Sequence, residues 1–212
     1  MITTILFDMD GVITNTEKYH FESWQEAFKL ADIDITKNNY HEHVQARNHQ
    51  QAISAVIGSN DKKIIELISQ TKRQVYKERI NKHVDVYQDT MNFIKDVKQS
   101  KLKLAVVSAS SMAKEVLDKA GLLGYFDLVI EGTKDNNLRN KPYPDLYLHA
   151  MALLESQPEE TLIIEDSLSG IKAGIKSGAS VIGVERDKLD DFEHKRCTVV
   201  PKITTDLVGE LI

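Results

Sequence analysis

Short apolar runs alternate with helical patterns after residue 85, and this alternation constrains the fold of the chain more than any other feature. Expected strands lie at residues 102–107, 126–130, 161–164, 180–184 and 198–200, and expected helices at 90–98, 112–120, 144–154, 168–176 and from Thr205. One more apolar run, Ile2–Phe7, opens the chain. Continuous apolar strands separated by helices are typical of a parallel sheet that is covered on both faces. The sequence therefore predicts an α/β fold with a Rossmann-like three-layer core and right-handed crossovers.

Residues 14–84 interrupt this pattern with a predicted helical insert. Apolar residues recur at helical spacing over 16–31 and 61–80, on either side of a polar segment at 36–51. Asn15 or Thr16 is expected to cap the first of these helices. We therefore expect an α/β core of residues 1–13 and 85–212, with a small helical cap domain of residues 14–84 inserted after the first strand.

Composition limits the class of protein. The chain has 212 residues, of which 42% are hydrophobic and 28% charged, as in ordinary soluble globular proteins. Its net charge of −5 does not indicate a nucleic-acid-binding protein. No run approaches the ~18 apolar residues of a membrane span, and we expect no signal peptide. The single cysteine, Cys197, excludes an intramolecular disulfide and is expected to pack as a small strand residue. We expect a cytoplasmic, monomeric enzyme or binding protein.

Two carboxylates, Asp8 and Asp10, follow the first apolar run directly, and Gly11 comes next. Side chains two apart on a strand share a face, and ligand sites in open α/β sheets lie at the carboxyl ends of strands. Two acids at such an edge repel each other, so they need a cation or a proton. The alternative is that Asp8 and Asp10 are ordinary turn residues.

The expected strand at 102–107 runs into Ser108-Ala109-Ser110 and then into a helix. A hydroxyl at a strand end beside a helix N-terminus can bind an anion, because free N–H groups and the helix dipole favour phosphate. The alternative is that Ser110 simply caps the helix.

Lys141 stands before Pro142, which favours an extended backbone at the lysine and a helix start just afterwards. A lysine held in a loop can neutralise nearby carboxylates and an anionic ligand. The alternative is a solvated loop lysine.

Two more acids, Glu165 and Asp166, follow the apolar strand at 161–164. If Asp8, Asp10 and Asp166 converge, each pair of charges repels by roughly 4 kcal/mol at about 4 Å and an effective dielectric near 20. A hard divalent cation with oxygen ligands removes this conflict, and Mg²⁺ with a phosphate is the usual pairing. The alternative, that Asp166 or Ser167 caps the next helix, leaves Glu165 unexplained.

Together, these segments resemble the four motifs of the haloacid dehalogenase superfamily. The first motif is Asp8-Met9-Asp10-Gly11-Val12, and Ser108, Lys141-Pro142 and Glu165-Asp166 follow in the expected order and strand contexts. The helical insert resembles the small C1 cap. The closest likeness within the superfamily is to the β-phosphoglucomutase-like and phosphatase group, through residues 7–14, Tyr19-His20, Trp24 and Ser108-Ala109-Ser110.

The resemblance implies a role for each motif residue. Asp8 is the nucleophile that forms an aspartyl-phosphate, and Asp10 is the general acid and base. Mg²⁺ is held by Asp8, by the backbone carbonyl of Asp10 and by Asp166, with Glu165 close by or acting through water. Ser108 and Lys141 hold the transferring phosphoryl oxygens, with Ala109 and Ser110 beside them as substrate-binding residues. Phosphoryl transfer depends on such positioning and charge neutralisation.

In the predicted cap, His20 and Trp24 are four residues apart and share a helix face. The resemblance implies that both bind substrate and that His20 assists Asp10. The alternative is that they form a packing pair. Three cations further along, Lys72, Arg73 and Lys77, are predicted to form a solvated helix face.

The chain departs from the β-phosphoglucomutase pattern where that pattern grips a second phosphate. The pattern has an Arg in a Gly-x-Ser-Arg loop and a Lys-Asn pair, whereas this chain has Gln45-Ala46-Arg47-Asn48-His49 and Ser111-Met112. His49 is mostly neutral at pH 7, and Arg47 can substitute from a different angle. In addition, Tyr87-Gln88-Asp89 replaces the usual Tyr-Pro-Gly, which we expect to affect only a local turn.

These patterns predict an enzyme that hydrolyses a small phosphate ester, above all a sugar phosphate, with Mg²⁺ as cofactor. The first alternative is a β-phosphoglucomutase that interconverts β-glucose 1-phosphate and glucose 6-phosphate. The second is a non-catalytic protein that binds Mg²⁺ and a phosphorylated metabolite. Asp8 and Asp10 disfavour the second alternative, since a binding module needs neither in particular.

Overall fold

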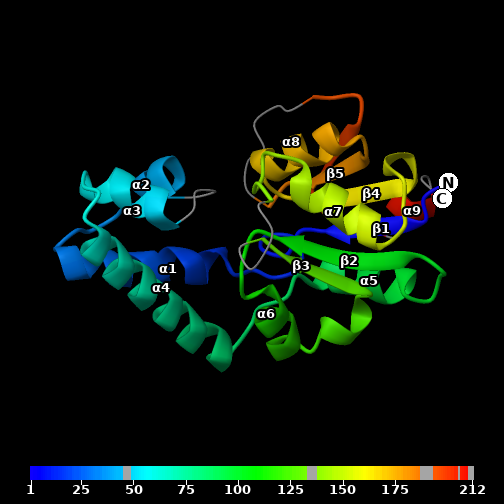
Figure 1. The fold of residues 1–212 in the computed structure, drawn as a ribbon. Helices are drawn as coiled ribbons and strands as arrows, with labels where there is room; N and C mark the ends of the chain where they lie inside the picture. The colour runs from blue at the N-terminus through cyan, green and yellow to red at the C-terminus, as the bar shows by residue number, and fades with distance from the viewer. Residues whose placement is uncertain (45–48, 133–137, 187–192, 205, 210–212) are drawn as a thin grey trace. The chain divides into compact units, whose positions relative to one another are not determined.

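The computed structural model describes residues 1–44, 49–132, 138–186, 193–204 and 206–209. It divides into two compact units (Figure 1). Unit 1 comprises Met1–Asn15 and Asp85–Ile212, and unit 2 comprises Thr16–Val84.

Unit 1 is built on a parallel sheet whose described strands run in the order β3-β2-β1-β4-β5-β6. The strands are β1 (Thr4–Phe7), β2 (Lys103–Ser108), β3 (Leu128–Glu131), β4 (Thr161–Glu165), β5 (Ser180–Val184) and β6 (Cys197–Val200). Each corresponds to an apolar run in the sequence. The prediction of a Rossmann-like parallel α/β fold is confirmed.

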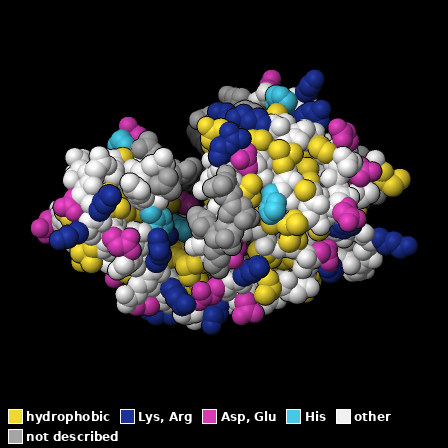
Figure 2. All heavy atoms as spheres, in the orientation of Figure 1, with side chains coloured by type: hydrophobic (Ala, Val, Ile, Leu, Met, Phe, Trp, Pro, Cys, Tyr) yellow, Lys and Arg dark blue, Asp and Glu magenta, His cyan; other side chains and the backbone are white. Residues whose placement is uncertain are grey.

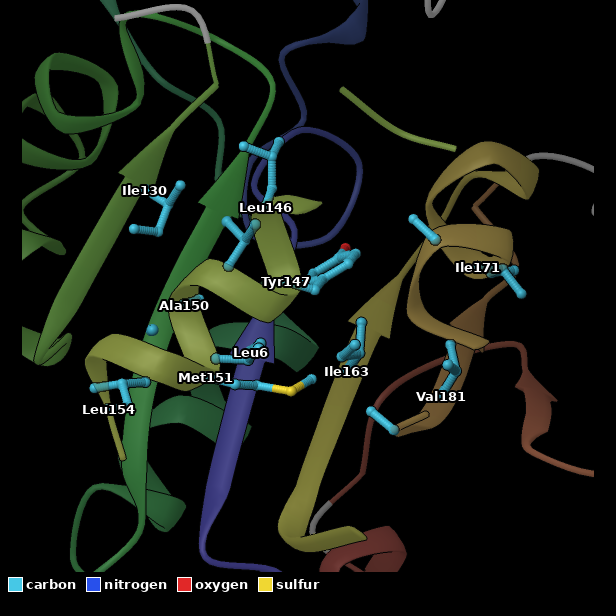
Figure 3. Close-up of a cluster of buried hydrophobic side chains, with 14 residues drawn as sticks. Leu6, Ile130, Leu146, Tyr147, Ala150, Met151, Leu154, Ile163, Ile171 and Val181 are labelled. Atoms are coloured by element: carbon cyan, nitrogen blue, oxygen red, sulfur yellow. The ribbon is translucent and has the colours of Figure 1, made fainter. Parts of the chain in front are cut away.

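Helices cover both faces of this sheet. They are α5 (Gln88–Val97), α6 (Ala113–Lys119), α7 (Asp145–Leu153), α8 (Leu168–Ser177) and α9 (Asp206–Gly209), with 3-10 turns η3 (Leu123–Tyr125) and η4 (Pro158–Glu160). On one face, Leu6 and Ile163 pack against Met151 of α7 in a buried cluster that also includes α8 residues (Figure 3). On the other face, the Phe7 ring lies 6.1 Å from the Phe93 ring of α5. Neighbouring strand residues point to opposite faces, so the unit has three layers.

The strand register determines which residues lie side by side at the carboxyl edge of the sheet. Phe7 pairs with Val106 on one side and with Ile164 on the other. The residues that follow these three are Asp8, Val107 and Glu165, so they lie level at the carboxyl edge of the sheet. The backbone N–H of Asp8 donates to the Ile164 carbonyl, which extends the β1–β4 pairing into the site.

In the described residues of unit 2, the regular structure is helical. Its elements are α1 (Glu17–Phe28), η1 (Lys29–Ala31), α2 (Lys37–Asn39), the π-helical turn η2 (Tyr40–Val44), α3 (His49–Ile57) and α4 (Lys62–Lys82). A buried cluster around Trp24, Phe28, Ile53 and Ile68 joins α1, α3 and α4. The segment at 36–51 therefore contains short helical turns and the start of α3.

The start of α1 differs from the prediction. Thr16 occupies the N-cap position, but its side chain makes no capping hydrogen bond, because its backbone is already helical there (φ −98°, ψ −4°). By contrast, Asp61 caps α4 through its side chain. Its carboxylate accepts hydrogen bonds from the N–H groups of Lys63 and Ile64. The helix expected from Thr205 is described only as α9, because residue 205 lies outside the described residues.

On the face that Figure 2 shows, acidic and basic side chains are interspersed over the surface. Among the described residues, no helix combines the length and the apolar composition needed to traverse a bilayer.

Candidate active site

Three carboxylates converge at the carboxyl ends of β1 and β4. Oxygens of Asp8, Glu165 and Asp166 lie within 4.8 Å of one another. Asp8 is 8% exposed and Glu165 is completely buried. Carboxylate oxygens are the ligands that a hard divalent cation prefers, so Asp8 and Asp166 fit a site for such a cation, with Glu165 beside them.

Lys141 lies among these acids. Its Nζ donates to Asp8 Oδ1, to Glu165 Oε1 at 2.5 Å and to the Val107 carbonyl at 3.2 Å. Burial alone lowers the pKa of Lys141, but Asp8 and Glu165 outweigh it and raise the pKa well above the usual value. The alternative of a solvated loop lysine is therefore wrong, since the side chain is only 8% exposed.

The same burial acts on Asp8 in the opposite sense. The pKa of Asp8 is raised to about 8, because burial and the charges of Glu165 and Asp10 raise it by more than Lys141 lowers it. A nucleophilic carboxylate must be ionised, and one lysine shared between two acids does not achieve this near neutral pH. An ionised Asp8 at neutral pH would therefore need a second positive charge beside it.

Glu165 is surrounded by hydrogen-bond donors. Its Oε1 accepts from Lys141 and from the hydroxyl of Tyr147 at 2.7 Å. Its Oε2 accepts from the N–H of Asp166 at 3.1 Å and from the N–H and Oγ–H of Ser167 at 3.2 and 3.0 Å. Both oxygens are thus engaged in holding Lys141 and the Asp166-Ser167 turn. No sequence pattern indicates Tyr147, which looks like an ordinary core residue of α7.

Ser167 also caps the next helix. Its Oγ accepts from the N–H of Gly170 at 3.1 Å at the start of α8. Of the two capping residues considered from the sequence, Ser167 fills this position and Asp166 does not. The Asp166 carboxylate instead belongs to the acidic group described above.

Two glycines leave room for these carboxylates. Gly11 has a φ of +85°, and a β-carbon there would lie 1.8 Å from Asp166 Oδ2. A β-carbon on Gly170 would lie 1.8 Å from Glu165 Oε1. Only glycine permits both the backbone conformation at residue 11 and the close approach at both positions.

Asp10 lies in a tight loop beside Asp8. The Met9 carbonyl accepts from the N–H groups of Ile13 and Thr14, and the N–H of Gly11 donates to the Thr14 carbonyl. Asp10 is half-buried, and its charge is one of those that raise the pKa of Asp8. The loop thus holds Asp10 near the acidic group.

The serine segment after β2 also reaches the carboxyl edge. Ser108 is buried, and its Oγ accepts from the N–H of Ser110 at 3.0 Å. Ser110 Oγ accepts from the N–H of Met112, the residue that itself occupies the N-cap of α6. Ser110 therefore shapes the turn before α6 and does not cap the helix. Ala109 is exposed, with its Cα 2.9 Å from where a β-carbon on Gly132 would lie.

Unit 2 contains a second cluster of polar and aromatic side chains. Lys72 is 5% exposed, and its Nζ lies 2.9 Å from His20 Nδ1 and 4.5 Å from the centre of the Tyr76 ring. The His20 ring stacks on Tyr76 at 4.3 Å. The prediction of a solvated face is therefore wrong for Lys72, which points into the unit, while Arg73 and Lys77 are exposed.

His49 joins this cluster from α3. Its ring meets Trp24 edge-on at 4.9 Å, and its Nδ1 lies 2.8 Å from Ser69 Oγ. Burial, with added repulsion from Lys72 and Arg73, lowers the pKa of His49 to about 3, so the ring is neutral. Arg47, which the sequence analysis put forward as an alternative phosphate ligand, lies outside the described residues.

Comparison with known proteins identifies the family. The model of the haloacid dehalogenase-like hydrolase family matches residues 5–184. The chain belongs to this family. It is an enzyme of the family, and the four motifs predicted from the sequence lie within the matched range.

Similar proteins include a mutase and a phosphatase. The chain is 26% identical to a β-phosphoglucomutase of Bacillus subtilis, over 98% of this chain and 92% of that protein. It is 27% identical to a phosphorylated carbohydrates phosphatase of Thermotoga maritima, over 82% of this chain and 81% of that protein. Among solved structures, β-phosphoglucomutase from Clostridium difficile superposes with a TM-score of 0.84 at 25% identity, covering 100% of this chain and 95% of that one.

Proposed function

We propose that this chain hydrolyses a small phosphate ester, above all a sugar phosphate, through an aspartyl-phosphate intermediate. The observation that carries the proposal is the buried arrangement of Asp8 with Lys141, beside Asp166 and a fully hydrogen-bonded Glu165. A carboxylate held by a lysine at the end of a parallel strand can attack phosphorus, and it has no evident structural reason to be there.

The chemistry requires two displacements. An oxygen of Asp8 forms a bond to phosphorus, and the bond between phosphorus and the ester oxygen breaks. Asp10 gives its proton to that leaving oxygen. Asp10 then takes a proton from water, whose oxygen attacks phosphorus and releases inorganic phosphate and the Asp8 carboxylate. Lys141 and Ser108 hold the phosphoryl oxygens throughout.

Asp8, Asp166 and the backbone carbonyl of Asp10 would hold Mg²⁺. When bound, the ion neutralises charge on the phosphoryl oxygens and keeps Asp8 ionised. We assign Glu165 to the support of Lys141, because Lys141, Tyr147 and the Asp166-Ser167 turn already donate to both of its oxygens.

We propose that unit 2 is a C1-type cap domain. His20, Trp24, Arg47 and His49 remain its predicted substrate contacts. We also propose that the division into an α/β core and a helical cap follows the two compact units. Closure of a cap excludes water from the reaction until a step needs it.

The second candidate function is a β-phosphoglucomutase, which the similarity to the Bacillus subtilis enzyme favours. Such an enzyme must hold a second phosphate while the bisphosphate intermediate turns round. His49 is neutral and turned toward Ser69 and Trp24, so it offers no positive charge for this purpose. The Lys-Asn pair of the mutase pattern is also replaced, by Ser111-Met112, and these two departures together favour hydrolysis.

The test uses the full chain with Mg²⁺, β-glucose 1-phosphate and a trace of β-glucose 1,6-bisphosphate. Glucose 6-phosphate and free phosphate are measured together, with Asp8→Asn as the control. Predominant free phosphate supports hydrolysis, and predominant glucose 6-phosphate shows a mutase. A wild type that binds the ester without turnover, with equal binding in Asp8→Asn, would point to the non-catalytic alternative, and a wild type that neither binds nor converts it would remove this sugar as the substrate.

A further inference from the structure

Arg186, which follows β5, joins several segments of unit 1. Its side chain is 13% exposed. The Nε–H donates to the Gly11 carbonyl at 3.3 Å, and Nη2 donates to Asp89 Oδ1 at 2.9 Å and to Thr90 Oγ1 at 3.0 Å. The guanidinium also lies over the Tyr87 ring, 3.9 Å from its centre. The arginine thus connects the end of β5, the start of α5 and the loop after β1.

The loop after β1 is held at three consecutive carbonyls. Arg186 donates to the carbonyl of Gly11, Thr90 Oγ1 donates to that of Val12 at 2.7 Å, and the N–H of Tyr87 donates to that of Ile13 at 3.0 Å. All three donors come from the start of α5 or from Arg186, which contacts it. Such a set of bonds defines the path of the backbone immediately after Asp10.

Asp89 holds Arg186 in place. Its Oδ1 accepts from Arg186, and its Oδ2 accepts from the N–H of Ile203 at 3.0 Å. Burial raises the pKa of Asp89, but the bonds from Arg186 and Ile203 outweigh this and lower it, so the carboxylate is charged at neutral pH. The expectation that Tyr87-Gln88-Asp89 affects only a local turn is therefore wrong, because Asp89 connects α5 with residues 186 and 203.

The position of Gly11 is critical for the site. Its Cα faces the Asp166 carboxylate so closely that no β-carbon fits between them. Its N–H is bonded to the Thr14 carbonyl and its carbonyl to Arg186. Bonds on both sides of Gly11 therefore fix the residue that directly follows Asp10 and that lies against the Asp166 carboxylate.

We propose that Arg186 is a positioning residue for phosphoryl transfer, acting through the Gly11 carbonyl to hold the loop that carries Asp10. The expected effect of Arg186 on turnover rests on the proposed function. Its role in holding the loop does not rest on it, because that role is measured on the free chain. A displacement of about 1 Å in a reacting group can cost about 100-fold in rate.

The test compares Arg186→Met, Arg186→Lys and a matched control, Arg196→Met. Arg196 also donates to a backbone carbonyl, that of Gly178, which lies after α8. Lysine at 186 keeps a cation for Asp89 but lacks the second donor group that reaches Gly11. Hydrogen–deuterium exchange of residues 11–15 is measured on the free chain, together with Tm, kcat and KM.

We expect both Arg186 variants to exchange these amides at least about tenfold faster and to lose about 10- to 100-fold in kcat, with KM changed less than about threefold. Arg186→Lys should recover most of the Tm lost in Arg186→Met, and Arg196→Met should match the wild type in loop exchange and kcat. Full recovery of kcat and loop exchange in Arg186→Lys would overturn the proposal, since the pair with Asp89 would then be sufficient. An equal loss in Arg196→Met would overturn it too.

Failure of the proposed function gives a different pattern. A wild-type chain with no phosphoryl transfer would remove the effect on turnover, and exchange at residues 11–15 would still decide whether Arg186 holds the loop. Unchanged exchange in Arg186→Met would end the proposal, whatever the activity.

Discussion

At the level of single residues, the site depends on glycines as well as on charged side chains, because a glycine leaves room for a neighbouring carboxylate. Gly170 stands in the first turn of α8 directly over the Glu165 carboxylate. That carboxylate in turn holds Lys141 against Asp8. A methyl group at residue 170 would displace Glu165 and, through it, Lys141.

Gly170→Ala is expected to destabilise the chain by about 1–3 kcal/mol and to lower kcat. In a helix, alanine is more favourable than glycine by about 1 kcal/mol. A net loss in the free energy of unfolding would therefore show that the steric conflict with Glu165 is larger than this gain. Urea unfolding and steady-state kinetics measure the two effects. Gly124→Ala is the control, because nothing lies within 4 Å of a β-carbon there. A Gly170→Ala chain as stable and active as the wild type would contradict the packing described.

The sequence indicated which carboxylates come together where these residues stand at the end of an apolar strand. Asp8, Glu165 and Asp166 all stand in such positions, and the structure brings them together. Tyr147 was missed because a tyrosine among apolar residues of a helix usually belongs to the core. Its hydroxyl bond to Glu165 depends on how α7 crosses the sheet, which the local sequence does not encode.

At the level of elements, α1, α3 and α4 of unit 2 pack around side chains that are not all apolar. His49 from α3 lies between Trp24 of α1 and Ser69 of α4, and it is neutral because its surroundings disfavour its charge. An unfolded chain would bind a proton at this histidine near pH 6.5. The packing of α3 is therefore linked to pH.

Unit 2 should lose stability as the pH falls from about 6.5 toward 3, because only the unfolded chain binds a proton at His49 in that range. At pH 5 the loss relative to pH 7 is about 1–2 kcal/mol from this residue. Trp24, the single tryptophan, reports the unfolding of unit 2 by fluorescence in urea. His49→Gln should reduce the difference between pH 7 and pH 5 by that amount. An equal pH dependence in both chains would refute the assignment.

Helices and strands were predictable because each has a clear period in the sequence, as in β4 and α8. Lys72 shows the limit of this method. Helical spacing places a lysine on a face, but only the packing of α1 against α4 reveals that this face is buried beside His20 and Tyr76.

At the level of the whole molecule, the proton on Asp8 and the proposed Mg²⁺ compete. Without a cation, the pKa of Asp8 is raised to about 8, well above the ~3.9 of an unfolded chain. The folded chain then holds a proton that the unfolded chain has lost, so the stability without a cation decreases as the pH rises from about 4 to 8.

Mg²⁺ should therefore raise Tm more at pH 8 than at pH 6. At the higher pH, Asp8 is protonated in a smaller fraction of the molecules, so Mg²⁺ displaces fewer protons when it binds. Thermal unfolding with and without Mg²⁺ at several pH values measures this. In Asp8→Asn, the Mg²⁺ effect should be small and independent of pH. A shift in Tm that is equal at both pH values in the wild type would count against Asp8 as a ligand.

Contacts between distant parts of the chain were the least predictable. Nothing in the sequence near Arg186 indicates Gly11 or Asp89 as its partners, since the three residues come from separate segments that meet only in the folded sheet. The departure at Tyr87-Gln88-Asp89 was visible, but its consequence depends on this long-range geometry.

The insertion of unit 2 also bears on the entropy of closing the central sheet. β1 pairs with β2 and β4, which both follow unit 2 in the chain, so the pairing partners of the first strand are far from it in sequence. The ends of unit 2 are joined in the fold, because the N–H of Asn15 donates to the Asp85 carbonyl and Thr14 forms a bridge with Val86. Once residues 16–84 have folded with their ends together, only residues 8–15 and 85–102 separate β1 from β2, and this shorter loop lowers the entropic cost of pairing the two strands by about 1 kcal/mol.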